Sequence, residues 1–155
     1  MIERRVNVRG IINKNGKIFA QTLNPGIDNV SRDDWMCTPG GGLEAMESLE
    51  EGLVREMIEE TGVTPEIGRL LFIQQFVRGN GIEQLEFFYE IKNWDDYLSV
   101  DLTKTSHGVE EIKWVGFVDA KTANVLPKFL QEIDIEKFIN TNQPVRLIDN
   151  LRENK

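Results

Sequence analysis

The chain has 155 residues, of which 40% are hydrophobic, so it can bury one core of ordinary domain size. Its formal net charge of −8 repels phosphate-rich polymers and argues against a general nucleic-acid-binding surface. No apolar run approaches membrane-spanning length, and the N-terminus lacks the apolar stretch of a signal peptide. The lone Cys37 cannot pair within the chain, which suits a reducing compartment. We therefore expect a single cytoplasmic domain over residues 1–155, with no membrane association.

The N-terminal part predicts a hairpin followed by loops. Residues 5–12 alternate apolar and polar side chains, as a strand does, and residues 13–16 read Asn-Lys-Asn-Gly, a strong turn signal. Residues 17–23 are then the returning strand. Residues 24–34 are rich in Pro, Gly, Asn, Asp and Ser and predict a loop. Residues 39–42, Pro-Gly-Gly-Gly, cannot propagate a helix and also predict a loop.

A helix is predicted from Ser48 to Thr61, with Gly62 as its C-terminal stop. At 100° per residue, five side chains fall on one arc, which we expect to pack on a core. These are Leu53, Val54, Met57, Ile58 and Thr61. Three carboxylates occupy the neighbouring arc, so they border the apolar face: Glu56, Glu59 and Glu60.

The C-terminal half predicts further strands and a second helix. Residues 69–78 and 82–91 are apolar and aromatic runs on either side of a Gly-Asn-Gly turn, which indicates a second hairpin. Residues 95–108 are polar and irregular, 111–117 form a short strand, and 127–140 form a helix. Strands combined with a central and a C-terminal helix predict an α/β sandwich around a mixed sheet.

The acidic residues of the first helix conflict with the rules for a solvated helix. Glu56 and Glu60 are like charges at i,i+4, and Glu59 and Glu60 lie in the last turn, where the helix dipole is already negative. Most charge runs on helices are simply solvated, and that alternative stays open. A hard cation such as Mg²⁺, which takes oxygen ligands, would relieve the repulsion. The pattern therefore predicts a divalent-cation site.

The segment from Gly41 to Val63 resembles the signature of the Nudix hydrolase family. In that signature a glycine, a glutamate, an Arg-Glu pair, a Glu-Glu pair and a closing glycine stand at fixed spacing. Met57 stands where Ile, Leu or Val is commoner, and it is still apolar. The matching residues are Gly41, Glu47, Arg55, Glu56, Glu59, Glu60 and Gly62. The resemblance implies an α/β fold, a Nudix-type α/β/α sandwich around a mixed sheet.

The resemblance also implies a reaction, a cofactor and candidate residues. Family members hydrolyse a pyrophosphate bond in a nucleoside diphosphate linked to another moiety, and they use Mg²⁺ or Mn²⁺. Arg55 is expected to orient carboxylates or touch phosphate, and Glu47 to contact Arg55. The implied metal ligands are Glu56, Glu60 and Glu59, with the carbonyl of Gly40. The general base is expected from a loop over the site, as Glu111 or Glu110, with Glu59 as the competing assignment.

The partner is expected to be a small phosphorylated substrate of the nucleotide type, and a homodimer is one expected state. Trp35 is a candidate for stacking on a base, and Arg9 and Arg78 for contacting phosphate or sugar; a core or surface role is the alternative for each. His107 is interpreted as a surface or capping residue. Nothing in the sequence separates nucleoside triphosphates from nucleotide sugars, dinucleoside polyphosphates or ADP-ribose.

Two other functions are weighed against hydrolysis. A nucleotide-binding module without turnover would be expected to have lost signature glutamates, and this chain keeps all of them. Isopentenyl-diphosphate isomerase shares the fold but uses a catalytic cysteine in a different motif, and Cys37 lies in the wrong place.

Overall fold

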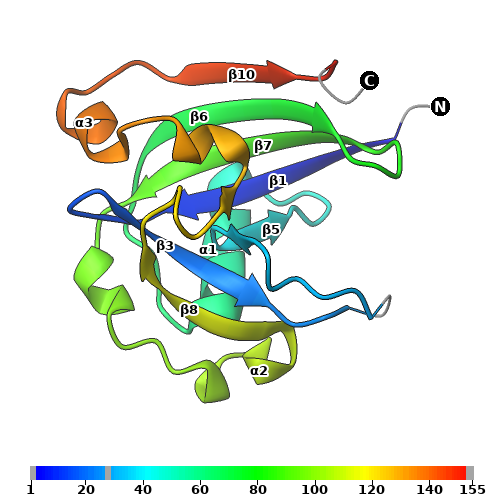
Figure 1. The fold of residues 1–155 in the computed structure, drawn as a ribbon, viewed down its shortest axis with the longest axis vertical. Helices are drawn as coiled ribbons and strands as arrows, with labels where there is room; N and C mark the ends of the chain where they lie inside the picture. The colour runs from blue at the N-terminus through cyan, green and yellow to red at the C-terminus, as the bar shows by residue number, and fades with distance from the viewer. Residues whose placement is uncertain (1–2, 27–28, 153–155) are drawn as a thin grey trace.

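The computed structural model describes residues 3–26 and 29–152, and within them the strands form two five-stranded sheets (Figure 1). The first sheet has the order β10-β6-β7-β1-β5. The β10–β6 and β7–β1 pairs are parallel and the other two are antiparallel, so the sheet is mixed. Its strands are β1 (Arg4–Ile11), β5 (Gly40–Gly42), β6 (Ile67–Val77), β7 (Glu83–Ile91) and β10 (Arg146–Asn150).

The second sheet packs across the first and has the order β2-β3-β4-β9, with β8 paired to β3. The chain enters this sheet at β2, and the predicted Asn15-Gly16 turn, where both residues have positive φ angles of 52° and 86°, joins β2 to β3. The expected hairpin between residues 5–12 and 17–23 is therefore wrong: the returning strand β3 pairs with β2, β4 and β8, whereas β1 pairs with β5 and β7. The strands of this sheet are β2 (Asn13–Lys14), β3 (Lys17–Leu23), β4 (Met36–Cys37), β8 (Ile112–Val118) and β9 (Val125–Leu126).

Helix α1 (Leu49–Thr61) has the predicted ends, and both are fixed by local hydrogen bonds. Ser48 and Glu51 form a capping box, with two distances of 3.1 Å between side-chain oxygens and backbone nitrogens. Gly62 ends the helix in the left-handed conformation at φ 74°. The predicted core arc holds for Leu53 and Met57, but Ile58 is 39% exposed, because α1 rests on β1 and β5 along a narrower face.

The core lies on both faces of the mixed sheet. On one face α1 contributes Leu53 and Met57, which pack with Val8 of β1. On the other face, Phe72 and Phe88 meet the second sheet and the C-terminal elements, with ring centroids 6.3 Å apart in an edge-to-face arrangement. Helix α3 (Ile135–Asn140) closes this face through Ile135 and Phe138. The α/β class and the helix–sheet–helix layering are thus confirmed.

Three local predictions are wrong in detail. The Pro-Gly-Gly-Gly loop ends in a strand, β5, because glycines let the backbone approach β1: a Cβ on Gly40 would lie 2.0 Å from the Val8 carbonyl oxygen. The predicted helix over 127–140 is split into a 3-10 turn, η3 (Lys128–Gln131), and α3, which Asp134 caps through the Lys137 amide at 3.0 Å. The 95–108 segment contains two 3-10 turns, η1 (Trp94–Tyr97) and η2 (Leu102–Lys104), and α2 (Gly108–Glu111) follows.

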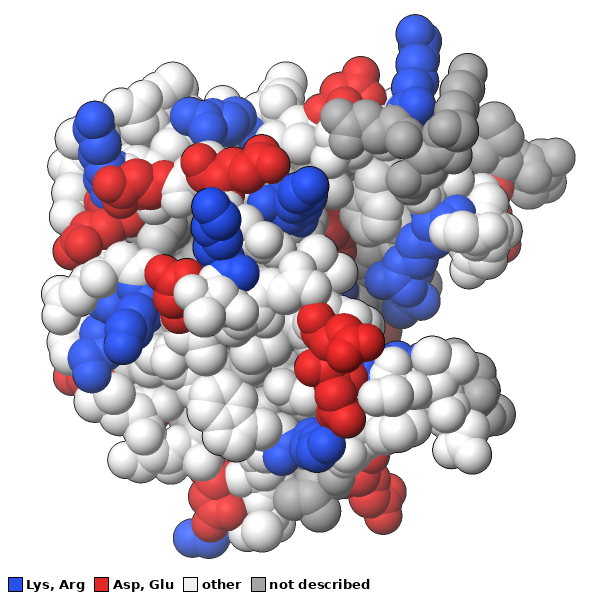
Figure 2. Space-filling view, in the orientation of Figure 1, with Lys and Arg blue, Asp and Glu red and all other residues white. Residues whose placement is uncertain are grey.

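On the face shown in Figure 2, acidic and basic side chains are interspersed, and no extended basic surface is present there. Within residues 3–26 and 29–152, no helix is both long enough and apolar enough to cross a membrane.

Candidate active site

Arg55 ties helix α1 to the loop before it. Its Nε and Nη2 donate to the two oxygens of Glu47 at 2.7 and 2.9 Å, and Nη2 also donates to the Gly42 carbonyl at 3.0 Å. The expected contact with Glu47 is therefore present, and hydrogen bonding from Arg55 lowers the pKa of Glu47 to about 2. The third nitrogen, Nη1, donates to Glu56 at 3.0 Å and to Glu59 at 3.3 Å. One guanidinium thus orients three carboxylates.

Glu56 is held against the glycine loop. Its side chain is buried, and a Cβ on Gly41 would fall 2.7 Å from the carboxylate carbon and from Oε1. Only glycine leaves room for this carboxylate at that point of β5. The signature that residues 41–63 resemble holds this glycine and this glutamate at a fixed spacing, and the contact between them gives that spacing a steric reason.

Glu60 is the most buried of the three helix carboxylates. Its side chain is enclosed, and Oε2 accepts hydrogen bonds from Gln21 Nε2 at 2.8 Å and from the Gly40 amide at 3.3 Å. Burial disfavours the charged form and raises the pKa of Glu60 to about 7, although Arg9 and the Gln21 hydrogen bond act in the opposite direction. An acid with a pKa near neutrality inside a cavity is typical of a functional group.

His107 joins the helix to the segment that carries the candidate bases. Its amide donates to the Glu59 carbonyl at 3.1 Å, and its Nε2 lies 3.2 Å from the Glu59 carboxylate. Its Nδ1 lies 2.9 Å from Glu111 Oε2, so Glu111 is brought to the site through His107. The side chain of Glu110 is exposed, and its backbone carbonyl accepts a hydrogen bond from Asn24 Nδ2 at 3.2 Å. His107 is partly exposed, and its interpretation as a surface or capping residue stays a prediction.

Arg9 lies between the helix carboxylates and β7. Its Nε donates to Glu86 Oε2 at 3.2 Å, and its Nη1 donates to the carbonyls of Thr38 and Gly40, each at 3.2 Å. Burial disfavours its charge, but the neighbouring carboxylates of Glu86 and Glu60 outweigh burial and raise the pKa of Arg9. Arg9 is therefore a fixed cation in the interior.

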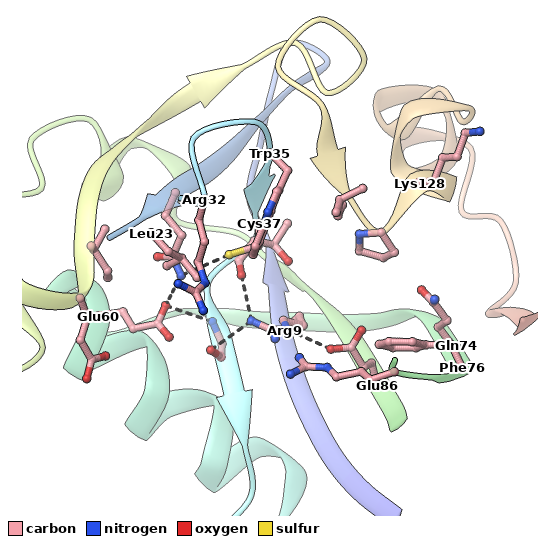
Figure 3. Close-up of a pocket in the computed structure, with 18 of the residues that line it drawn as sticks. Arg9, Leu23, Arg32, Trp35, Cys37, Glu60, Gln74, Phe76, Glu86 and Lys128 are labelled. Atoms are coloured by element: carbon pink, nitrogen blue, oxygen red, sulfur yellow. Dashed lines mark hydrogen bonds and ion pairs between the residues drawn. The ribbon is translucent and has the colours of Figure 1, made fainter. Parts of the chain in front are cut away.

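These groups surround a cavity of about 770 Å³ between the two sheets, a volume in the usual range for ligand pockets. Figure 3 shows Glu60 at one side of it, Gln74 and Phe76 at the other, and Arg9 between them. All three predicted substrate contacts, Trp35, Arg9 and Arg78, line the cavity, although their roles stay predictions. Of the predicted metal and catalytic groups, the lining includes Gly40, Glu60 and Glu111.

The cavity wall carries polar atoms with no partner in the protein. In the described part of the chain, four buried side-chain oxygens accept or donate no hydrogen bond, and three of them belong to cavity residues. They are Gln21 Oε1, Thr38 Oγ1 and Gln74 Oε1. Because an unpartnered buried polar group is unfavourable, such atoms mark places where water or a ligand binds.

The residues present fit a divalent cation by their chemistry. Glu56, Glu59 and Glu60 supply the carboxylate oxygens that Mg²⁺ prefers, and both Glu56 and Glu59 accept from the same Arg55 nitrogen. Across residues 3–26 and 29–152, no three Asp, Glu, His or Cys side chains already form a compact metal cluster. The ligand set of Glu56, Glu59, Glu60 and the Gly40 carbonyl therefore stays a prediction.

Comparison with known proteins decides the family. Residues 1–133 match the NUDIX domain. The chain belongs to the NUDIX family. This Nudix domain is 32% identical over 110 residues to a Caenorhabditis elegans protein named nudix hydrolase 1. It is 40% identical over 55 residues to the RNA pyrophosphohydrolase of Zymomonas mobilis. These alignments cover 69% and 36% of the chain. They cover only 28% and 32% of the two relatives, so the chain spans about three tenths of their length.

A solved structure shows the same fold. A NUDIX hydrolase from Nitrosomonas europaea aligns with a TM-score of 0.69 at 21% identity, over 92% of this chain and 93% of that one. The resemblance drawn from residues 41–63 is thus confirmed.

Sequence reasoning missed four cavity residues that come from four different strands or loops: Gln21, Thr38, Gln74 and Glu86. Glu86 and Gln74 do carry a signal, because each is a polar residue on a strand face where Phe88 and Phe72, two positions away, are core. In a strand, residues two apart share a face. A polar residue in such a position breaks the local pattern and is typical of a functional site.

Proposed function

We propose that this Nudix domain hydrolyses the pyrophosphate bond of a nucleoside diphosphate linked to another moiety, with Mg²⁺ or Mn²⁺ as cofactor. The observation that carries the proposal is the meeting of Glu60 of α1, Gly40 of β5 and Arg9 of β1 at one side of a ligand-sized cavity. Family membership supports the reaction class.

The negative charge of a diphosphate is the main barrier to its hydrolysis, because the phosphate oxygens repel an attacking oxygen nucleophile. A bound divalent cation neutralises that charge and lowers the pKa of a water molecule. The chain itself contributes the fixed cation Arg9, which Glu86 and two carbonyl oxygens hold in place beside Glu60. Arg55 keeps Glu56 and Glu59 in position through Nη1.

Glu111 is the proposed general base. Its carboxylate lies at the cavity wall and is oriented by His107, which is itself anchored to Glu59 on α1. A base must be positioned before its pKa matters, and this chain of contacts provides the position. Glu59 is the competing assignment, because it is reached by both Arg55 and His107.

The test compares Glu56→Gln and Glu60→Gln with wild type on a panel of diphosphates in Mg²⁺, Mn²⁺ or EDTA. The panel holds nucleoside triphosphates, nucleotide sugars, ADP-ribose and diadenosine polyphosphates. We expect metal-dependent release of phosphate or nucleotide, and a loss of at least about 100-fold in kcat in each variant, the scale of removing one electrostatic contact to the transition state.

Glu50→Gln is the matched control, because Glu50 is an exposed carboxylate in the first turn of the same helix. It should leave turnover unchanged. Wild-type rates in both the Glu56 and Glu60 variants would remove the metal-ligand assignment. Tight nucleotide binding with no turnover of any panel member would instead indicate a binding module.

A further inference from the structure

The side of the cavity away from Glu60 has a different chemistry from the carboxylate side. Figure 3 shows Phe76 of β6 on that side beside Gln74, and the cavity lining also includes Trp35 before β4, Leu126 and Pro127, together with the basic residues Arg78 and Lys128. Apolar and aromatic walls with few polar groups suit a flat ring better than a hydroxyl-rich sugar, because each sugar hydroxyl needs its own polar partner. We call Trp35, Phe76, Leu126 and Pro127 the apolar wall.

Gln74 is the polar group beside this wall. It follows Phe72 and precedes Phe76 on the same face of β6, its side chain is only 4% exposed, and its Oε1 has no hydrogen-bond partner in the described structure. A carboxamide offers an acceptor oxygen and an NH₂ donor side by side. A buried carboxamide oxygen without a partner is costly to the fold, so folding alone gives no reason for it.

The neighbour of Gln74 across the sheet is already engaged. Gln74 pairs in register with Glu86 on β7, and Glu86 is held by Arg9. An ionised carboxylate only accepts hydrogen bonds, so Glu86 cannot donate to the unpartnered Gln74 Oε1. Gln74 Oε1 is thus a buried acceptor on this side of the cavity with no partner in the described residues (Figure 3).

We propose that Gln74 is a specificity-determining residue that hydrogen-bonds the edge of a nucleobase lying against the apolar wall. The base presents an adjacent donor and acceptor, which a carboxamide pairs in two parallel hydrogen bonds. The phosphates of the same substrate then extend past Arg9 toward Glu60. This orientation of the substrate rests on the proposed function. The substrate class is then nucleotides whose base is recognised by the Gln74 side chain.

The inference also explains the placement of the polar atoms. Thr38 and Gln21, which carry the other unpartnered oxygens, lie toward the Arg9 and Glu60 side, where Thr38 bonds Arg9 and Gln21 bonds Glu60. No hydrogen bond joins the Gln74 side-chain oxygen to these groups in the described residues. Ligands without a pyrophosphate bond can therefore probe binding at Gln74 apart from the reaction.

The experiment measures binding of the four common nucleoside 5′-monophosphates and of ribose 5-phosphate, which has the same sugar and phosphate but no base. Neither the nucleoside 5′-monophosphates nor ribose 5-phosphate contains a pyrophosphate bond, so the binding result does not depend on hydrolysis. Titration calorimetry with wild type should show at least one nucleotide binding at least about 10-fold tighter than ribose 5-phosphate, the effect of one good hydrogen-bonded pair.

Gln74→Leu should remove this preference and leave the affinity for ribose 5-phosphate unchanged. The melting temperature should stay the same or rise, because the substitution removes an unpartnered buried amide. Gln75→Leu is the matched control, since Gln75 is the next residue of β6 and points to the opposite face. It should keep the preference.

A second ligand pair tests the hydrogen bonds themselves. Methylation of the ring-edge donor of the preferred base should weaken binding to wild type and have no effect on Gln74→Leu. The proposal is overturned if all four nucleotides bind no better than ribose 5-phosphate, or if Gln74→Leu keeps the preference. Base-selective binding without turnover of any diphosphate would refute the proposed function and leave this inference standing. Turnover of a diphosphate without any base preference would refute this inference and leave the proposed function standing.

Discussion

Glu60 makes the stability of the metal-free protein depend on pH in a direction opposite to that of most carboxylates. Burial raises its pKa from an ordinary value of 4.5 to about 7. The folded chain therefore holds a proton in the window between these values, where the unfolded chain has released it. Because the native state binds more protons there, the free energy of unfolding falls as pH rises through the window.

The magnitude follows from the displacement of the pKa. A shift of this size lowers the free energy of unfolding by about 3 kcal/mol at pH values above the folded-state pKa. Below the unfolded-state pKa this loss of stability is absent. Glu60→Gln removes the titration and keeps the contacts, because Gln21 and the Gly40 amide both donate to the same oxygen, which the amide oxygen can replace. The variant should match wild type near pH 4.5 and be about 3 kcal/mol more stable at pH 8.

The assay is urea unfolding of wild type, Glu60→Gln and the exposed control Glu50→Gln in EDTA from pH 4.5 to 8.5. In thermal scans at pH 8, the Glu60 variant should melt about 6–12 °C higher. Millimolar Mg²⁺ should raise the melting temperature of wild type at pH 8 and shift the variant less, because a cation favours the deprotonated ligand. Parallel pH profiles of wild type and Glu60→Gln would refute the reasoning that Glu60 is destabilised by burial.

Two further substitutions test the loop before α1. Gly41→Ala places a Cβ 2.7 Å from the Glu56 carboxylate, so it should lower kcat by more than about 10-fold. Gly79→Ala is the control and should leave kcat unchanged, because a Cβ there meets nothing within 4 Å. Equal kcat values in both variants would contradict the steric role of Gly41 beside Glu56. Met46 is fully exposed at φ 66°, so Met46→Gly should raise the free energy of unfolding by about 1 kcal/mol with activity unchanged. Met46→Ala, which keeps a Cβ, should give no such gain in urea unfolding, and a gain there would point away from backbone strain.

Elements with local signals were predictable. The ends of α1 follow from Ser48 and Gly62, and the β6–β7 hairpin follows from the glycines that flank Asn80. Elements that depend on distant partners were not. Strand β10 pairs in parallel with β6 across more than seventy residues of chain, and parallel pairing leaves no turn between the strands to recognise.

The candidate site divides in the same way. The glutamates of α1 lie within one short segment, where charge and spacing could be read together. The cavity wall is assembled from separated strands, so Gln74 and Glu86 look like ordinary strand residues until the register places them opposite each other. The contacts of His107 with Glu59 and Glu111 could not be anticipated, because these two carboxylates lie on different elements.

The position of Arg9 has a consequence for how ligands influence each other. The guanidinium is bound to Glu86 near one side of the cavity, and its charge lowers the proton affinity of Glu60 at the other. A ligand that displaces Glu86 or draws Arg9 toward itself changes the charge that Glu60 experiences. Thermodynamic linkage then requires that protonation of Glu60 alter the affinity for that ligand by the same factor. Any ligand that moves Arg9 is thus coupled to the protonation of Glu60 through a single side chain on β1.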